Sequence, residues 1–197
     1  MIPGPVLRSL AALVAGLALV AAVAPPALAR TSGVQPCADA GVVATRANGS
    51  AVKAAVVCLI NLQRTSRGLP ALRVDARLDR SAQHWSSSMV VSGDFSHGAN
   101  FGARITAAGF NWSAAGENIA TGYPTAKAVV GGWMASLGHC QNILSPRFAF
   151  VGTGIVPRGI RSLGTGGATW TQDFGLPLGW RQPSRDFGPA GGCPYRG

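Results

Sequence analysis

The chain has 197 residues, with 17 Lys and Arg against 7 Asp and Glu, and a formal net charge of +10 at pH 7. This length suits one domain with a substantial core. The positive charge favours contact with an anionic cell-envelope polymer or lipid surface. The basic residues are scattered, without a dense run or interleaved aromatics, so we expect no specific nucleic-acid partner.

Residues 1–29 have the pattern of an export signal. Arg8 supplies a short positive region, residues 9–23 form an apolar run of Leu, Ala and Val, and residues 27–29 read Ala-Leu-Ala, a small-x-small cleavage pattern. We predict a signal peptide cleaved after Ala29 and a secreted, extracellular mature protein. The alternative is an uncleaved N-terminal anchor, although the run is short for a membrane span.

Apolar spacing predicts several helices after an irregular N-terminal arm at residues 30–48. Asp75 and Thr125 are suitable N-cap residues, and Gly93 and Gly109 follow predicted helix ends. The predicted helices cover 50–67, Asp75 to Gly93, 101–108, and a segment that begins after Thr125.

The pattern changes to alternation after Pro146. Residues 148–156 and 168–174 are predicted as strands joined by a glycine-rich turn at 164–167. The turn lacks the lysine and the following helix of a phosphate-binding loop. Helices first and a small antiparallel sheet late predict an α+β fold. Residues 176–197 are predicted to form a Pro/Gly-rich tail.

The four cysteines allow three disulfide pairings. Disulfides are expected in an exported protein. We prefer Cys37–Cys58 with Cys140–Cys193, because this pairing joins the N-terminal arm and the C-terminal tail to the body. A cysteine zinc site is the alternative, although the chain has no C-x-x-C spacing.

Glu117 is the only glutamate of the chain, and all three histidines lie in the stretch around it. It stands between a glycine and an asparagine, which indicates a site and not a solubility role. His97 and His139 belong to motifs described below. His84 lies on the flank of a predicted helix beside Trp85, so we interpret it as a surface or half-buried residue.

Short motifs follow one another in a fixed order. They are Gly-Asp-Phe-Ser-His at 93–97, Ala-Gly-Glu-Asn-Ile-Ala at 115–120, Trp-Met-Ala-Ser-Leu-Gly-His-Cys-Gln-Asn-Ile-Leu at 133–144, Val-Gly-Thr-Gly at 151–154 and Trp-Thr-Gln-Asp-Phe-Gly at 170–175. Together with an opening helix that contains Asn61 and Arg64, and with the run 68–72, they resemble bacterial members of the CAP superfamily, also called SCP/TAPS or pathogenesis-related-1-like proteins. The resemblance covers residues 52–175. It implies an α-β-α sandwich, here placed at residues 49–175, and we expect a monomer.

The resemblance also implies a central cavity. In eukaryotic members two histidines and two glutamates there can bind a divalent metal. By motif, His97, Glu117 and His139 match three of these positions, while the fourth falls near Ser136, so the metal site is incomplete. Two imidazoles and a carboxylate still suffice for an open zinc site. The alternative is a structural network in which Glu117 accepts hydrogen bonds from both histidines. In either case we expect Glu117 to contact at least one histidine.

The motifs of common hydrolases, such as G-x-S-x-G and H-E-x-x-H, are absent from the sequence. The favoured hypothesis is therefore a non-enzymatic secreted module that binds a small hydrophobic ligand, a lipid or an envelope component, as family members that bind sterols or fatty acids do. The alternative is a zinc-dependent hydrolase using His97, Glu117 and His139 around a metal-bound water. Glu117 could not serve as both ligand and base. A third hypothesis is a structural envelope component without a ligand.

Overall fold

The computed structural model describes residues 1, 2, 4, 37–181, 192 and 193. Nearly all of the predicted signal peptide, the first part of the arm and most of the tail lie outside the described residues. The chain divides into two units, Met1–Gly33 and Val34–Gly197. All elements described below belong to the second unit. Within the described residues, no helix is long and apolar enough to cross a bilayer.

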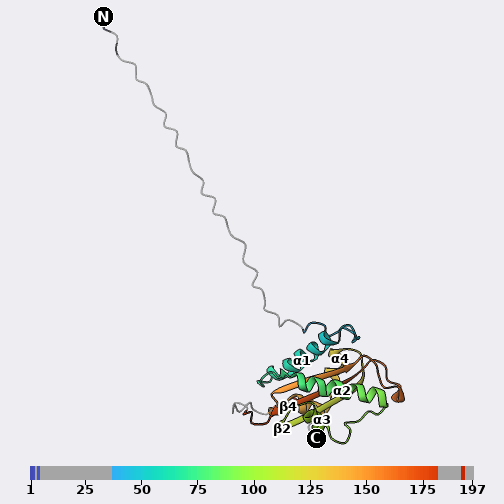
Figure 1. Ribbon diagram of the computed structural model, residues 1–197. Helices are drawn as coiled ribbons and strands as arrows, with labels where there is room; N and C mark the ends of the chain where they lie inside the picture. Colours follow the sequence, from blue (N-terminus) through green and yellow to red (C-terminus); the bar gives the residue numbers. More distant parts are fainter. Residues whose placement is uncertain (3, 5–36, 182–191, 194–197) are drawn as a thin grey trace. The chain divides into compact units, whose positions relative to one another are not determined.

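The second unit is built from helices and one four-stranded sheet (Figure 1). The elements are α1 (Gly49–Thr65), β1 (Arg73–Val74), α2 (Ala76–Ser92), α3 (Phe101–Ala107), β2 (Trp112–Tyr123), α4 (Ala126–Met134), α5 (Leu137–Ile143), β3 (Phe150–Val156), a 3-10 turn (Arg161–Leu163) and β4 (Ala168–Pro177). The strand order is β1-β3-β4-β2. The pairs β3–β4 and β2–β4 are antiparallel, and the short β1 pairs parallel with β3.

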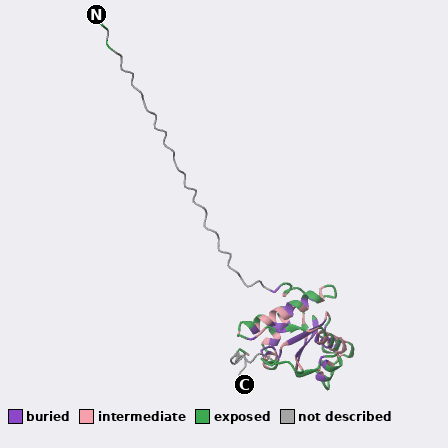
Figure 2. Cartoon of the chain, turned by 60° about the vertical axis from the view of Figure 1, so that its left-hand side comes forward, coloured by how far each residue is buried: buried purple, intermediate pink, exposed green. Residues whose placement is uncertain are grey.

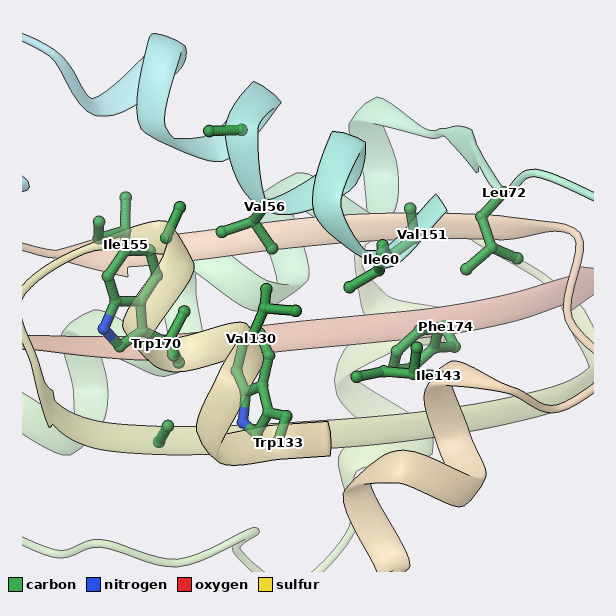
Figure 3. Close-up of a cluster of buried hydrophobic side chains, with 14 of the residues drawn as sticks. Val56, Ile60, Leu72, Val130, Trp133, Ile143, Val151, Ile155, Trp170 and Phe174 are labelled. Carbon is green, nitrogen blue, oxygen red and sulfur yellow. The ribbon is translucent and has the colours of Figure 1, made fainter. Parts of the chain in front are cut away.

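Helices cover both faces of the sheet, which confirms the predicted α+β sandwich. Side chains alternate along each strand, so neighbouring residues enter different layers. Ala120 and Val151 pack with α1, α4 and α5, whereas Ile119 and Phe150 pack on the α2 and α3 side. Figure 3 shows the first layer, with Trp133 and Trp170 among its large side chains. Buried residues occupy the strands and the inner sides of the helices (Figure 2).

The glycines of the Val-Gly-Thr-Gly motif let α2 lie directly on β3. A Cβ at Gly152 would lie 2.1 Å from the carbonyl carbon of Leu78, and one at Gly154 would lie 2.1 Å from the backbone oxygen of Ala82. These distances exclude any larger side chain. The helix itself starts and ends as its sequence predicts, because Asp75 accepts a hydrogen bond from the Arg77 N–H and Gly93 adopts a left-handed conformation.

The structure differs from the prediction mainly in the central motifs. Strand β2 was not predicted, because a strand buried on both faces lacks alternation and this one is rich in small and polar residues. The short α5 was missed as well. The sheet is mixed, since β1 pairs in parallel, and β4 continues to Pro177, two residues beyond the expected domain end at 175.

Both disulfides of the preferred pairing are present, Cys37–Cys58 and Cys140–Cys193. The first attaches the arm to α1. The arm also runs along the start of α4, where the Ala44 N–H donates to the Pro124 carbonyl and the Lys127 N–H donates to the Ala40 carbonyl. The second disulfide attaches Cys193 to α5.

Arg64 ties the end of α1 to the chain that enters β3. Its side chain is fully buried, and it donates to the carbonyl oxygens of Pro70, Ile143, Ser145 and Phe148. Burial lowers the pKa of Arg64 to about 10, so it stays charged at neutral pH. The planar guanidinium of arginine carries several N–H donors that can reach this set of carbonyls, whereas the single ammonium of a lysine cannot reach them all.

We therefore expect Arg64→Lys to lower the free energy of unfolding by about 2–4 kcal/mol, because buried carbonyls lose their donors. Urea denaturation measures this change. The exposed Arg161→Lys is the control and should change stability by less than about 0.5 kcal/mol. Equal effects of the two substitutions would show that Arg64 does not have this role.

Candidate functional site

Glu117 lies in the middle of β2, and its side chain is only 1% exposed. Both of its carboxylate oxygens are engaged. Oε1 lies 2.8 Å from His97 Nδ1, and Oε2 accepts a hydrogen bond of 2.5 Å from Arg104 Nη2. The expected contact between Glu117 and a histidine is thus present. An arginine, which the sequence did not indicate, takes the second oxygen.

Arg104 extends from α3 and joins three parts of the site. Besides Glu117, it binds the backbone oxygen of His97 through Nη1 at 2.9 Å. Its guanidinium carbon lies 3.7 Å from the centroid of the Trp85 ring, close enough for a cation–π interaction. Trp85 in turn donates from Nε1 to the Ser96 carbonyl. Arg104 and Trp85 therefore fix the loop that carries His97.

The hydrogen bond to Glu117 sets the tautomer of His97. A carboxylate only accepts hydrogen bonds, so Nδ1 must carry the proton. The second nitrogen, Nε2, then remains available on a side chain that is 49% exposed. This arrangement orients the imidazole while leaving one nitrogen for a ligand.

His139 lies on α5, across from the loop of His97. Asn118 donates from its side chain to the His139 carbonyl, and Asn142 donates to both the Asn118 side chain and the Glu117 carbonyl. These bonds hold α5 against β2. Burial, with a further contribution from His97, lowers the pKa of His139. Among the described residues, no hydrogen bond joins His139 to the Glu117 side chain.

Asp173 is the direct neighbour of Glu117 on β4 and is fully buried. Its carboxyl oxygens have no hydrogen-bond partner of standard geometry within the part of the chain that the structure describes. Burial raises the pKa of Asp173 well above its ordinary range, and the charge of Glu117 adds to this effect, while Arg104 opposes it. The pair therefore holds one carboxylate, Glu117, and one carboxyl that retains its proton more readily.

A pocket of about 450 Å³ opens along β2, which is an edge strand of the sheet. Its lining residues come from both helical layers and from the strand between them. They are Phe95, Ser96, His97, Ile119, Ala120, Thr121, Tyr123, Gly132, Trp133 and His139. The two histidines therefore face one mostly apolar space, whereas Glu117 lies behind His97 and does not line it.

The donors present do not fit the metal site implied by the resemblance. Among the described residues, no group of three or more His, Cys, Asp or Glu side chains is placed to hold a metal ion. Glu117 already has a histidine and an arginine on its two oxygens. A guanidinium next to the carboxylate repels a second cation. The alternative of a structural network is closer to the observed geometry, except that His139 is not a partner of Glu117.

His84 lies outside this site, exposed on α2, as the sequence indicated. Arg104 does not stand out in the sequence, because it is one of many scattered arginines. Asp173 was visible in the Trp-Thr-Gln-Asp-Phe-Gly motif, and pairing of that motif with β2 would have placed it beside Glu117.

Comparison with known proteins gives consistent matches. The profile described as "CAP: Cysteine-rich secretory protein family" matches residues 57–174. A Bacillus subtilis (strain 168) protein, Uncharacterized protein YkwD, is 37% identical over 129 residues, which cover 64% of this chain and 47% of that protein. The present chain thus corresponds to about half of its relative.

Solved structures agree with this match. An extracellular protein containing a SCP domain from Bacillus anthracis str. Ames superimposes with a TM-score of 0.54 at 26% identity, over 64% of this chain and 43% of that chain. An outer surface protein from Borrelia burgdorferi has a TM-score of 0.54 at 19% identity, over 62% of this chain and 90% of that chain. At that identity the second likeness concerns the fold alone.

The buried carboxyl pair predicts a pH dependence of stability. The pKa of Asp173 is raised in the folded state. The contribution of its neutral carboxyl to the free energy of unfolding is therefore complete below the pKa of the unfolded state, about 4, and is lost as the pH rises through the pKa of the folded state. The side chain introduced by Asp173→Asn has no charge at any pH, so the variant does not lose stability in this way as the pH rises. Its stability relative to the wild type should therefore increase by up to about 1.4 kcal/mol per pH unit above about pH 4.

Chemical denaturation between pH 4 and 8 tests this expectation, with the exposed Asp39→Asn as control. The control should follow the wild-type curve. Parallel curves for Asp173→Asn and the wild type would mean that Asp173 is equally ionised in both states.

Proposed function

The chain belongs to the CAP, or cysteine-rich secretory protein, family, and we propose that it is a secreted, non-enzymatic module that binds a small amphipathic ligand beside β2. The observation that carries this proposal is the pocket of about 450 Å³ with apolar walls and two histidines. Its size suits a small molecule.

The apolar walls support a hydrophobic ligand. Ile119, Tyr123 and Trp133 come from the sheet edge and α4, and Phe95 faces them from the loop before α3. Phe95 is 37% exposed, so an apolar ligand in the pocket would remove further apolar surface from water. Burial of this surface would provide most of the binding free energy.

The histidines would orient the polar end of the ligand. His97 presents Nε2, since Nδ1 is bonded to Glu117, and His139 lies on the opposite wall. A carboxyl or hydroxyl group can bond to imidazole nitrogens. We therefore infer a ligand with an apolar body and one oxygen-bearing head group, such as a fatty acid or a related envelope lipid.

The arrangement favours binding over hydrolysis. Glu117 is neutralised by Arg104 and serves to orient His97, so it is poorly placed as a general base toward the pocket. The zinc-dependent alternative would need a third donor, which the described residues do not bring to the two histidines.

Export is part of the proposal. The N-terminal signal pattern and the two disulfides support an oxidising, extracellular location. The similar Bacillus anthracis protein is described as extracellular. Because this chain covers less than half of that protein, its complete role is not transferred.

Decanoate and decanol serve as probes for the pocket, with binding measured by calorimetry. We expect saturable binding of decanoate with one site per chain, and Phe95→Ala should weaken it about fivefold, because the ligand loses an apolar wall. Comparison with decanol measures the contribution of the charged head group.

Leu163→Ala is the matched control, because Leu163 is an exposed apolar residue outside the pocket. It should leave the affinity unchanged. Absence of saturable binding by either probe, or equal weakening in both variants, would argue against the pocket as a lipid site.

A further inference from the structure

A groove lies at the other edge of the sheet from the pocket at β2. Strand β1 covers only the start of β3, and from Thr153 onward side chains of α2 form hydrogen bonds with the backbone groups at the edge of β3. Asp79 accepts from the Thr153 N–H, and Gln83 bonds both backbone groups of Ile155. Three adjoining hollows of about 270, 370 and 400 Å³ lie here, beside the start of α1. This groove shares no lining residue with the pocket at β2.

The groove is cationic. Lys53 and Ser50 line the first two hollows, Arg46 lines the second and third, and Arg158 lines the third. Among the residues that the structure describes, Asp79 is the one acidic residue that lines any of them. Lys53 is half-buried, and burial lowers its pKa, while Asp79 partly opposes this shift. No ion pair within 4 Å involves Lys53 among the described residues.

The start of α1 adds backbone donors to these cations. The N-cap residue Asn48 makes no side-chain bond to the helix, because its carboxamide binds the Thr45 N–H and the Val43 carbonyl instead. The first turn also lacks an acidic residue. Its N–H groups are therefore uncapped by side chains, and such a helix start favours an anion.

A buried hydroxyl without a partner provides an independent observation. Thr153 is 0% exposed, and its Oγ1 has no hydrogen-bond partner within the described part of the chain. It lines the same hollow as Ser50 and Lys53. A buried hydroxyl without a partner is costly, and it indicates a place where an acceptor would be stabilising.

We propose that this groove binds a phosphate-type oxyanion between Lys53 and the first turn of α1. The ammonium of Lys53 and the hydroxyl of Ser50 contact it, the helix start supplies backbone donors, and Thr153 lies in the floor. Arg46 and Arg158 continue the positive surface along the groove, which suits a chain of phosphate groups as well as a free phosphate. The site is separate from the pocket at β2, so it does not depend on the proposed function.

The test is a titration of the purified protein in low-salt, phosphate-free buffer, first with inorganic phosphate and then with tripolyphosphate. NMR amide shifts of Gly49, Ser50 and Ala51 locate the binding. We expect saturable shifts at these amides, and Lys53→Met with Arg46→Gln should weaken phosphate binding about tenfold. Thr153→Val, which keeps the shape of the side chain, should weaken it about threefold without loss of stability.

The matched control is Arg147→Gln with Arg161→Gln, because it removes the same charge from exposed positions outside the groove. It should change the affinity less than about twofold. Much tighter binding of tripolyphosphate than of phosphate would indicate a polymer-borne phosphate, and similar affinities a free phosphate. Both results support the site. Non-saturable shifts, or equal weakening in both double variants, would overturn it.

Discussion

Two carboxyl groups, those of Glu117 and Asp173, are buried side by side on neighbouring strands, and Arg104 is the one permanent cation among the described residues that bonds to this pair. Two adjacent carboxylates would repel each other strongly in such a place. The structure resolves this by pairing Glu117 with Arg104 and His97 and by raising the pKa of Asp173. The pairing of Glu117 with Arg104 and His97 requires α3, Trp85 and the loop of His97 to lie close to β2.

The same requirement determines the character of the pocket. Glu117 bonds to Arg104 and to His97, and its carboxylate does not line the pocket, whereas the imidazole of His97 does. The pocket therefore combines apolar walls with two imidazoles. The opposite edge of the sheet is cationic, and the Thr153 hydroxyl there has no hydrogen-bond partner among the described residues. One small sheet thus separates a mostly apolar pocket from a groove lined by cationic residues.

The sequence predicted the parts of the fold that depend on local pattern. The caps at Asp75 and Gly93 mark α2 because their preferences are local. Strand β2 could not be predicted in this way, since its polar residues are buried by partners distant in the chain. For the site, the solitary Glu117 and the two motif histidines were informative, and their partner Arg104 was not. Arg104 acquires its role only because α3 packs close to β2, and this contact between separate parts of the chain leaves no local pattern in the sequence.

Zinc binding by the metal-free protein tests most directly whether Arg104 and His97 satisfy Glu117. Calorimetry at neutral pH, combined with the imidazole nitrogen resonances of His97 and His139, reports both affinity and place. We expect no saturable zinc binding at the site, and the same negligible heats for His97→Ala. Uptake of one zinc per chain that shifts the resonances of both histidines and disappears in Glu117→Gln would show that Glu117 remains available as a metal ligand.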